Sequence, residues 1–135
     1  MCIFCQIVSK ESPSWTVYQD ELITAFFDYF PASKGHLLIV PNKHHENIFE
    51  IPDNTLAHLA KVSKKLALAY QKTLWVEHLN ILQSNGKFSG QEVFHYHMHL
   101  IPRAENDSVK LWWECHENLR ESYDELVGKI QGNLD

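Results

Sequence analysis

The chain has 135 residues, 44% of them hydrophobic, and a formal net charge of −5. This fits one compact domain, residues 1–135, with a hydrophobic core. No apolar stretch approaches the ~20 residues that span a bilayer, and no secretory signal is visible, so a cytoplasmic protein is expected. The acidic balance argues against broad binding to nucleic acid or membranes. Binding of a small anionic ligand is compatible with this net charge, because four basic residues lie beside the motifs described below: Lys34, Lys43, Lys87 and Arg103.

β-Branched and aromatic runs predict strands, and helical spacing of apolar residues predicts helices. The predicted strands cover residues 15–19, 22–28, 36–40, 79–83 and 93–103, and the helices cover residues 52–76 and 113–130. This order, with tight connections, favours an α+β fold: a five-stranded antiparallel sheet with two main helices packed on one face. The four tryptophans are expected in the core or in dimer contacts.

The strongest pattern is the alternation of histidine with apolar residues between Val93 and Arg103. Successive side chains of a strand point to opposite faces, so His95, His97 and His99 would share one face. Three imidazoles on one strand face are hard to explain by solubility alone. The pattern therefore predicts a catalytic or ligand-binding site.

The spacing of these histidines limits the chemistry that they can share. Alternate Cα atoms of a strand lie about 6.6 Å apart, which places His95 and His99 roughly 13 Å apart. One zinc ion could not easily collect all three rings, because zinc–nitrogen bonds are only about 2.0–2.1 Å long. A neutral imidazole can instead act as a covalent nucleophile. We expect His97 to attack phosphorus and His99 to hydrogen-bond a phosphate oxygen or the leaving group.

The loop before the histidines supports a phosphate-binding interpretation. Gly86 and Gly90 permit close approach of the backbone, while Asn85 and Gln91 offer amide donors. The Walker A pattern and the dinucleotide-binding Gly-x-Gly-x-x-Gly pattern are both absent. The loop is weak evidence by itself and gains weight from its position directly before the histidines.

The Cys-x-x-Cys pair formed by Cys2 and Cys5 has three interpretations: a redox pair, half of a zinc site, or packing. A redox pair usually follows a strand at a helix N-terminus, and no strand can precede Cys2. Two thiolates with two imidazoles make a closed tetrahedral site, so structural zinc is the leading interpretation.

The motifs together resemble the signature of the histidine triad family of nucleotide hydrolases and transferases. The signature reads Gly90-Gln91-x-x-x-His95-x-His97-x-His99-x-x-Pro102-Arg103. The similarity covers nearly the whole chain and resembles the bacterial-type branch, through Cys2-x-x-Cys5, Trp15-Thr16-Val17-Tyr18, Ala25-Phe26-x-Asp28, Pro31, Gly35-His36 and Val40-Pro41-x-x-His44.

The resemblance implies a homodimer with a sheet extended across it, and a nucleotidyl group carried on His97 and then released by water. It implies that Asp28 binds ribose hydroxyls and that His36 lies at the edge of the same site. The implied catalytic residues are His97, His99 and Gln91, and the implied phosphate contacts are Asn85, Gly90, Gln91 and His99. The resemblance also supports His44 and His95 as the imidazole ligands of the zinc site, in which case His95 does not react.

Glu92 departs from this pattern, because several relatives carry Ser or Thr there, and a hydroxyl can contact phosphate. A carboxylate would repel phosphate. We therefore expect Glu92 to point away or to alter the leaving-group preference.

The leading function is an enzyme that cleaves at the α-phosphate of nucleoside phosphoramidates or dinucleoside polyphosphates such as diadenosine tetraphosphate. The alternative is a nucleotide-binding regulatory module with little or no turnover. The intact triad and Gln91 favour the enzyme. The expected partner is a purine nucleotide, with adenosine favoured, and neither nucleic acid nor a membrane. Apolar residues suited to a nucleoside pocket are Phe4, Ile7, Phe26 and Ile39.

Overall fold

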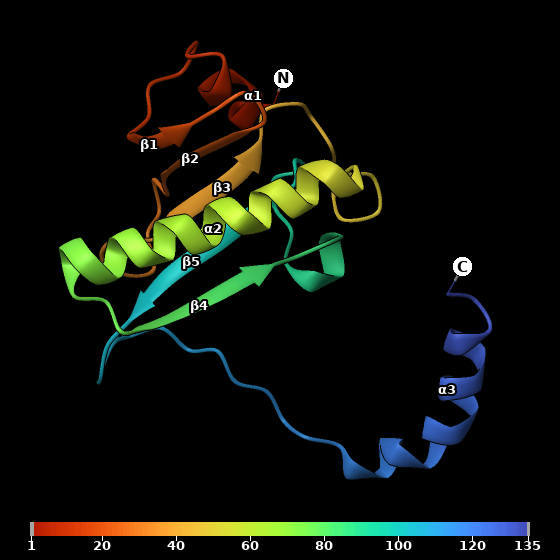
Figure 1. The fold of residues 1–135 in the computed structure, drawn as a ribbon. Coiled ribbons are helices and arrows are strands. Elements are labelled where there is room, and N and C mark those ends of the chain that lie inside the picture. Colours follow the sequence, from red (N-terminus) through yellow and green to blue (C-terminus); the bar gives the residue numbers. More distant parts are fainter. Residues whose placement is uncertain (1, 135) are drawn as a thin grey trace.

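A computed structural model describes residues 2–134, which form a five-stranded antiparallel sheet with helices around it (Figure 1). The strands are β1 (Thr16–Gln19), β2 (Ile23–Phe27), β3 (Leu37–Pro41), β4 (His78–Gln83) and β5 (Met98–Arg103). Their order in the sheet is β1-β2-β3-β5-β4, and every neighbouring pair is antiparallel. The α+β fold and the five strands predicted from the sequence are confirmed.

The two faces of the sheet are covered by different helices. Helix α2 (Asp53–Leu74) lies across one face (Figure 1), where Leu37 and Ile39 of β3 join its buried leucines in the main core. The alternate residues Leu38 and Val40 point to the other face and pack with Phe4 of the short helix α1 (Ile3–Val8). The second face is therefore covered by a short helix that is not one of the two main helices expected from the sequence.

Helix α1 was not predicted, because its sequence carries little helix-specific signal. It has only six residues, and Cys2 at its N-cap makes no side-chain capping hydrogen bond. Its formation depends on burying Phe4, which is 7% exposed, against the sheet. Burying an aromatic side chain of this size contributes roughly 1.5–3 kcal/mol. The helix also turns Cys2 and Cys5 toward the same side, one turn apart.

The histidine-rich segment differs from the predicted strand, since β5 begins at Met98 rather than at Val93. The ladder between β3 and β5 ends where Ile39 pairs with Met98. Further along β3, Pro41 has no N–H to continue such a ladder. The backbone N–H of Tyr96 instead donates to the carbonyl of His45 at 2.6 Å. His95 and His97 thus precede the regular strand.

The C-terminal part also differs from the prediction. The expected single helix is a 3₁₀ turn, η2 (Glu117–Ser122), followed by α3 (Tyr123–Gln131). We call residues 110–134 the C-terminal arm; each of them is exposed, and α3 stands apart from the sheet (Figure 1). Of the four tryptophans, all between 63% and 84% exposed, none lies in the core. Within residues 2–134 no helix is long and apolar enough to cross a membrane.

Candidate active site and metal centre

A cavity of about 440 Å³ opens on the α1 side of the sheet, beside His97. Of the four apolar residues expected to line a nucleoside pocket, Phe4, Ile7 and Phe26 line this cavity, whereas Ile39 is fully buried in the core under α2. Aromatic residues missed in the sequence complete the wall: Trp15, Phe27, Tyr29 and Phe30. The aromatic run that flanks Asp28 was the available signal. Such walls suit a planar, apolar base.

His97 lies at the floor of this cavity, 9% exposed, under the edge of the Phe4 ring. Its Nδ1 lies 2.8 Å from the carbonyl oxygen of His95. A carbonyl only accepts, so Nδ1 carries the proton and the lone pair of Nε2 is free. Burial lowers the pKa of His97, against the opposing effect of this hydrogen bond. The ring is therefore neutral at pH 7, the form that a nucleophile requires.

His99 has a fixed orientation as well, set through His36. The backbone N–H of Ala32 donates to Nδ1 of His36 at 2.9 Å, so the proton of this buried, neutral ring sits on Nε2. That Nε2–H lies 2.8 Å from Nδ1 of His99 and donates to it. The proton of His99 is thereby left on Nε2, as a donor for the cavity. Burial, with the neighbouring imidazoles adding to it, lowers the pKa of His99 to about 4.

Asp28 is brought to the same group by the turn after β2. One carboxylate oxygen accepts the N–H of Phe30 at 2.9 Å, and the other lies 3.5 Å from Nε2 of His36. Asp28, His36 and His99 present three possible metal-ligand atoms within 4.8 Å. However, Nδ1 of His36 faces the Ala32 N–H, so Nε2 bears a proton and has no lone pair for a metal. This group is built for hydrogen bonding.

Gln91 and Asn85 have their side chains engaged within the protein. The buried amide of Gln91 donates to the carbonyls of Glu46 and Val93, at 2.7 and 3.1 Å, and accepts the N–H of Gly86 at 2.7 Å. Asn85 pairs reciprocally with Gln83.

Both side chains shape the loop that holds the 3₁₀ turn η1 (Lys87–Ser89), and neither lines the cavity. Gly90, in contrast, lines it with a φ of +93°, a left-handed conformation that glycine adopts without strain.

The other cluster of possible ligands joins α1 to the histidine segment through Cys2, Cys5, His44 and His95, whose ligand atoms all lie within 4.8 Å of one another. Nδ1 of His95 lies 3.5 Å from each cysteine sulfur, and Nδ1 of His44 lies 3.4 Å from Sγ of Cys5. The two imidazole nitrogens are 3.2 Å apart. A tetrahedral zinc ion with ordinary bond lengths has S···N edges of about 3.5 Å and an N···N edge of about 3.3 Å. The donor set fits zinc.

The tautomer of His95 agrees with this role. Its Nε2 lies 2.8 Å from the carbonyl oxygen of Pro41 and donates to it, leaving the Nδ1 lone pair toward the sulfurs. Burial lowers the pKa of His95 to about 4, so the ring is neutral. A ligand held by a backbone carbonyl in this way is oriented before any metal binds.

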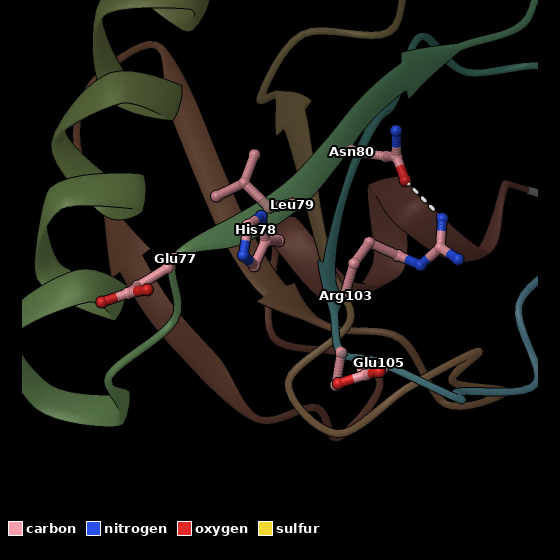
Figure 2. Close-up of a pocket in the computed structure, with 7 residues that line it drawn as sticks. Glu77, His78, Leu79, Asn80, Arg103 and Glu105 are labelled. Atoms are coloured by element: carbon pink, nitrogen blue, oxygen red, sulfur yellow. Dashed lines mark hydrogen bonds between the residues drawn. The ribbon is translucent and has the colours of Figure 1, made fainter.

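Arg103 is placed away from the histidine cavity, which corrects the expectation that it offsets the negative charge there. It lines a separate hollow of about 610 Å³ with Glu77, His78 and Asn80 (Figure 2). Its guanidinium donates to both carboxylate oxygens of Asp107, at 2.8 and 3.0 Å, and to Asn80 at 2.7 Å. These bonds tie the start of the C-terminal segment to the sheet. Lys34, Lys43 and Lys87 are likewise absent from the lining of the histidine cavity.

The sheet, the hydrogen-bonded histidines and the aromatic cavity define an α+β domain of the histidine-triad class. A family model described as the HIT domain matches residues 9–106, and the chain belongs to that family.

Two curated relatives extend this result. The chain is 42% identical over 132 residues to an uncharacterized HIT-like protein, MJ0866, from Methanocaldococcus jannaschii, covering 98% of this chain and all of that protein. It is 36% identical over 137 residues to adenosine 5'-monophosphoramidase HNT1 of Saccharomyces cerevisiae, covering 98% and 84% of the two chains.

Solved structures agree with the fold. A HIT family member from Bacillus subtilis has a TM-score of 0.92 and 36% identity, with 99% of this chain and 97% of that chain covered. A histidine triad protein from Mycobacterium smegmatis, described as Zn-bound, has a TM-score of 0.77 and 30% identity, with 95% and 96% covered.

Proposed function

We propose that this protein is a nucleotide hydrolase or nucleotidyl transferase that cleaves at the α-phosphate of nucleoside phosphoramidates or dinucleoside polyphosphates. The observation that carries the proposal is the geometry of His97. Its ring is buried at the floor of an aromatic cavity, and its Nδ1–H is held by the His95 carbonyl at 2.8 Å. The similarity to a relative named adenosine 5'-monophosphoramidase supports an adenosine substrate.

In the proposed reaction, Nε2 of His97 attacks the α-phosphorus, and the bond from phosphorus to the leaving group breaks. The leaving atom takes the electron pair and then a proton from water, while the Nε2–H of His99 donates a hydrogen bond to a phosphate oxygen or to the leaving atom. Water then attacks the phosphorus, the N–P bond breaks, and the nucleoside monophosphate leaves. Asp28 binds the ribose, and Gly90 allows the phosphate to approach the backbone. In this proposal Asn85 and Gln91 act by holding the loop in place.

The test compares wild type, His97→Ala and His78→Ala on adenosine phosphoramidate and diadenosine tetraphosphate. His97→Ala should lower turnover by on the order of 10³-fold or more. The wild type, quenched mid-reaction, should carry one nucleotidyl mass on the His97 peptide. His78 is exposed at the start of β4 and serves as the matched control. Tight nucleotide binding without turnover would instead indicate the regulatory module.

We also propose that Cys2, Cys5, His44 and His95 bind a structural zinc ion. The support is the tetrahedral spacing of their donor atoms and the similarity to a relative described as Zn-bound. When bound, the metal would hold α1 against the histidine segment.

Metal analysis of purified protein should find about one zinc per chain. Cys5→Ala should lose the metal and lower the unfolding temperature, whereas Cys115→Ala, at an exposed cysteine, should change neither. Absence of zinc from the wild type would refute the assignment.

We further propose a cytoplasmic homodimer. The free thiols support a reducing compartment. Strand β4 lies at the edge of the sheet, and its Ile81 is 46% exposed. The exposed apolar side chains of the C-terminal arm, among them Leu126 and Ile130, support its burial against a second copy.

A further inference from the structure

The histidine cavity has an unusual balance of charge for a phosphate site. Asp28 and Glu92 are among its lining residues, and no lysine or arginine is. Polyphosphate sites normally depend on lysine, arginine or a metal ion to neutralise the anion. Four basic residues lie near the histidine motifs in the sequence but do not line this cavity: Lys34, Lys43, Lys87 and Arg103.

The two carboxylates differ in how far they are compensated. Asp28 accepts the N–H of Phe30, faces His36, and has a side chain only 17% exposed. Glu92 is exposed and makes no hydrogen bond or ion pair within residues 2–134. Its negative charge is therefore free to act on a ligand in the cavity.

The position of Glu92 in the cavity lining indicates that its charge acts on the leaving group rather than on the base. The aromatic side chains of the lining come from α1, from Trp15 before β1, from β2 and from the segment that follows β2, and they suit the base. Gly90, Glu92 and Val93 line the same cavity from the segment that precedes His97 in the chain, and Val93 packs against the cluster that contains Phe4 and Phe26. A nucleotide with its base against the aromatic side chains and its α-phosphate at His97 leaves the part of the lining formed by Gly90 and Glu92 for the departing group.

We propose that Glu92 is a specificity-determining residue that favours amine leaving groups carrying a further positive charge and disfavours polyphosphates. The inference rests on the proposed function. Attack by His97 breaks the P–N bond, the nitrogen keeps the electron pair and gains a proton, and a neutral amine departs. An ammonium group elsewhere on that amine is attracted to Glu92, whereas a departing polyphosphate brings several negative charges toward it.

The experiment uses three substrates with the same adenosine 5'-phosphoryl group. One has a 1,3-diaminopropane leaving group with a free ammonium, one has the uncharged isostere butylamine, and the third is diadenosine tetraphosphate. The kcat/KM values are measured for wild type, Glu92→Gln, Glu92→Lys and Glu77→Gln. Glu77 is exposed in the separate hollow of Figure 2 and serves as the control.

The wild type and Glu77→Gln should prefer the ammonium substrate over butylamine by about three- to tenfold, and the preference should shrink at high salt. Glu92→Gln should remove it, and Glu92→Lys should reverse it while raising the relative rate on diadenosine tetraphosphate. If Glu92→Gln keeps the wild-type ratio of kcat/KM between the ammonium and butylamine substrates, the role of Glu92 is overturned while the proposed function stands. No cleavage of any substrate by the wild type would overturn the proposed function and this inference with it.

Discussion

Three histidines that look equivalent in the sequence differ in the structure because each ring meets a different backbone partner. His95 donates to the carbonyl of Pro41, and His97 donates to that of His95. His99 is oriented through His36 by the N–H of Ala32. The alternating pattern predicted a site, but the partners of His95 and His99 come from Pro41, Ala32 and His36, which lie outside that pattern.

These orientations give a prediction for the pH dependence of turnover. Burial lowers the pKa of His97 below its ordinary value of about 6.5, and that of His99 to about 4. Both rings are active when neutral, so activity is present above these pKa values and is lost as the pH falls through them. The kcat/KM of the wild type should therefore stay level from pH 8 to about 6.5 and decline below that. A rate that climbs steadily into acid would contradict the neutral nucleophile.

At the scale of the elements, the sequence predicted the strands well and the short connections less well. Strong β-branched and aromatic runs identify β2 and β3, where nearly every residue is buried. Helix α1 and the irregular entry into β5 depend on tertiary contacts, so local propensity does not reveal them. The cavity residues that were missed come from elsewhere, since Phe27 ends β2, Tyr29 and Phe30 follow it, and Trp15 precedes β1.

The turn between β1 and β2 is held by one carboxylate. Asp20 accepts the backbone N–H groups of Leu22 and Ile23, both at 2.8 Å, the hydroxyl of Tyr18 at 2.6 Å and Nε2 of His58 on α2 at 2.7 Å. Desolvation raises the pKa of Asp20, but these hydrogen bonds together outweigh it and hold the pKa well below its usual range. The turn is thereby joined to the helix over the core.

Asp20→Ala should lower the free energy of unfolding by about 2 kcal/mol at pH 7, because two backbone donors and two side chains lose their acceptor. The adjacent, exposed Glu21→Ala should change it by less than about 0.5 kcal/mol. The folded pKa is lowered, so the difference between the two variants is complete above the unfolded pKa of about 3.9, shrinks as the pH falls below it, and is lost only as the pH falls through the folded pKa. Urea denaturation at pH 7 and pH 3 measures both effects, and equal losses in the two variants would rule out this role for Asp20.

At the scale of the whole molecule, the C-terminal arm is the largest departure from expectation. The apolar spacing of its helix suggested packing on the sheet, yet α3 is exposed throughout. A helix of nine residues is marginal by itself in water, so its stability requires packing against something. Periodicity identifies the apolar face of a helix, but it does not identify the surface against which that face packs.

Replacing both Leu126 and Ile130 by Glu should convert the proposed dimer to a monomer, because two charges would enter an apolar contact. Glu125→Gln, at an exposed position of the same helix, should leave the dimer intact. Light scattering after size-exclusion chromatography measures the mass. A wild type that is monomeric at micromolar concentration would exclude the dimer.

His95 connects the two centres of the molecule through a single residue. Its ring belongs to the cluster with Cys2 and Cys5, while its carbonyl holds the ring of His97. If the proposed zinc site forms, oxidising Cys2 and Cys5 to a disulfide would remove two of the four donors of the metal and release the His95 ring. The His95 peptide plane would then be free to turn, and His97 would lose its orientation with every residue of the cavity intact. Treatment with peroxide should therefore abolish turnover. Subsequent reduction in the presence of zinc should restore it.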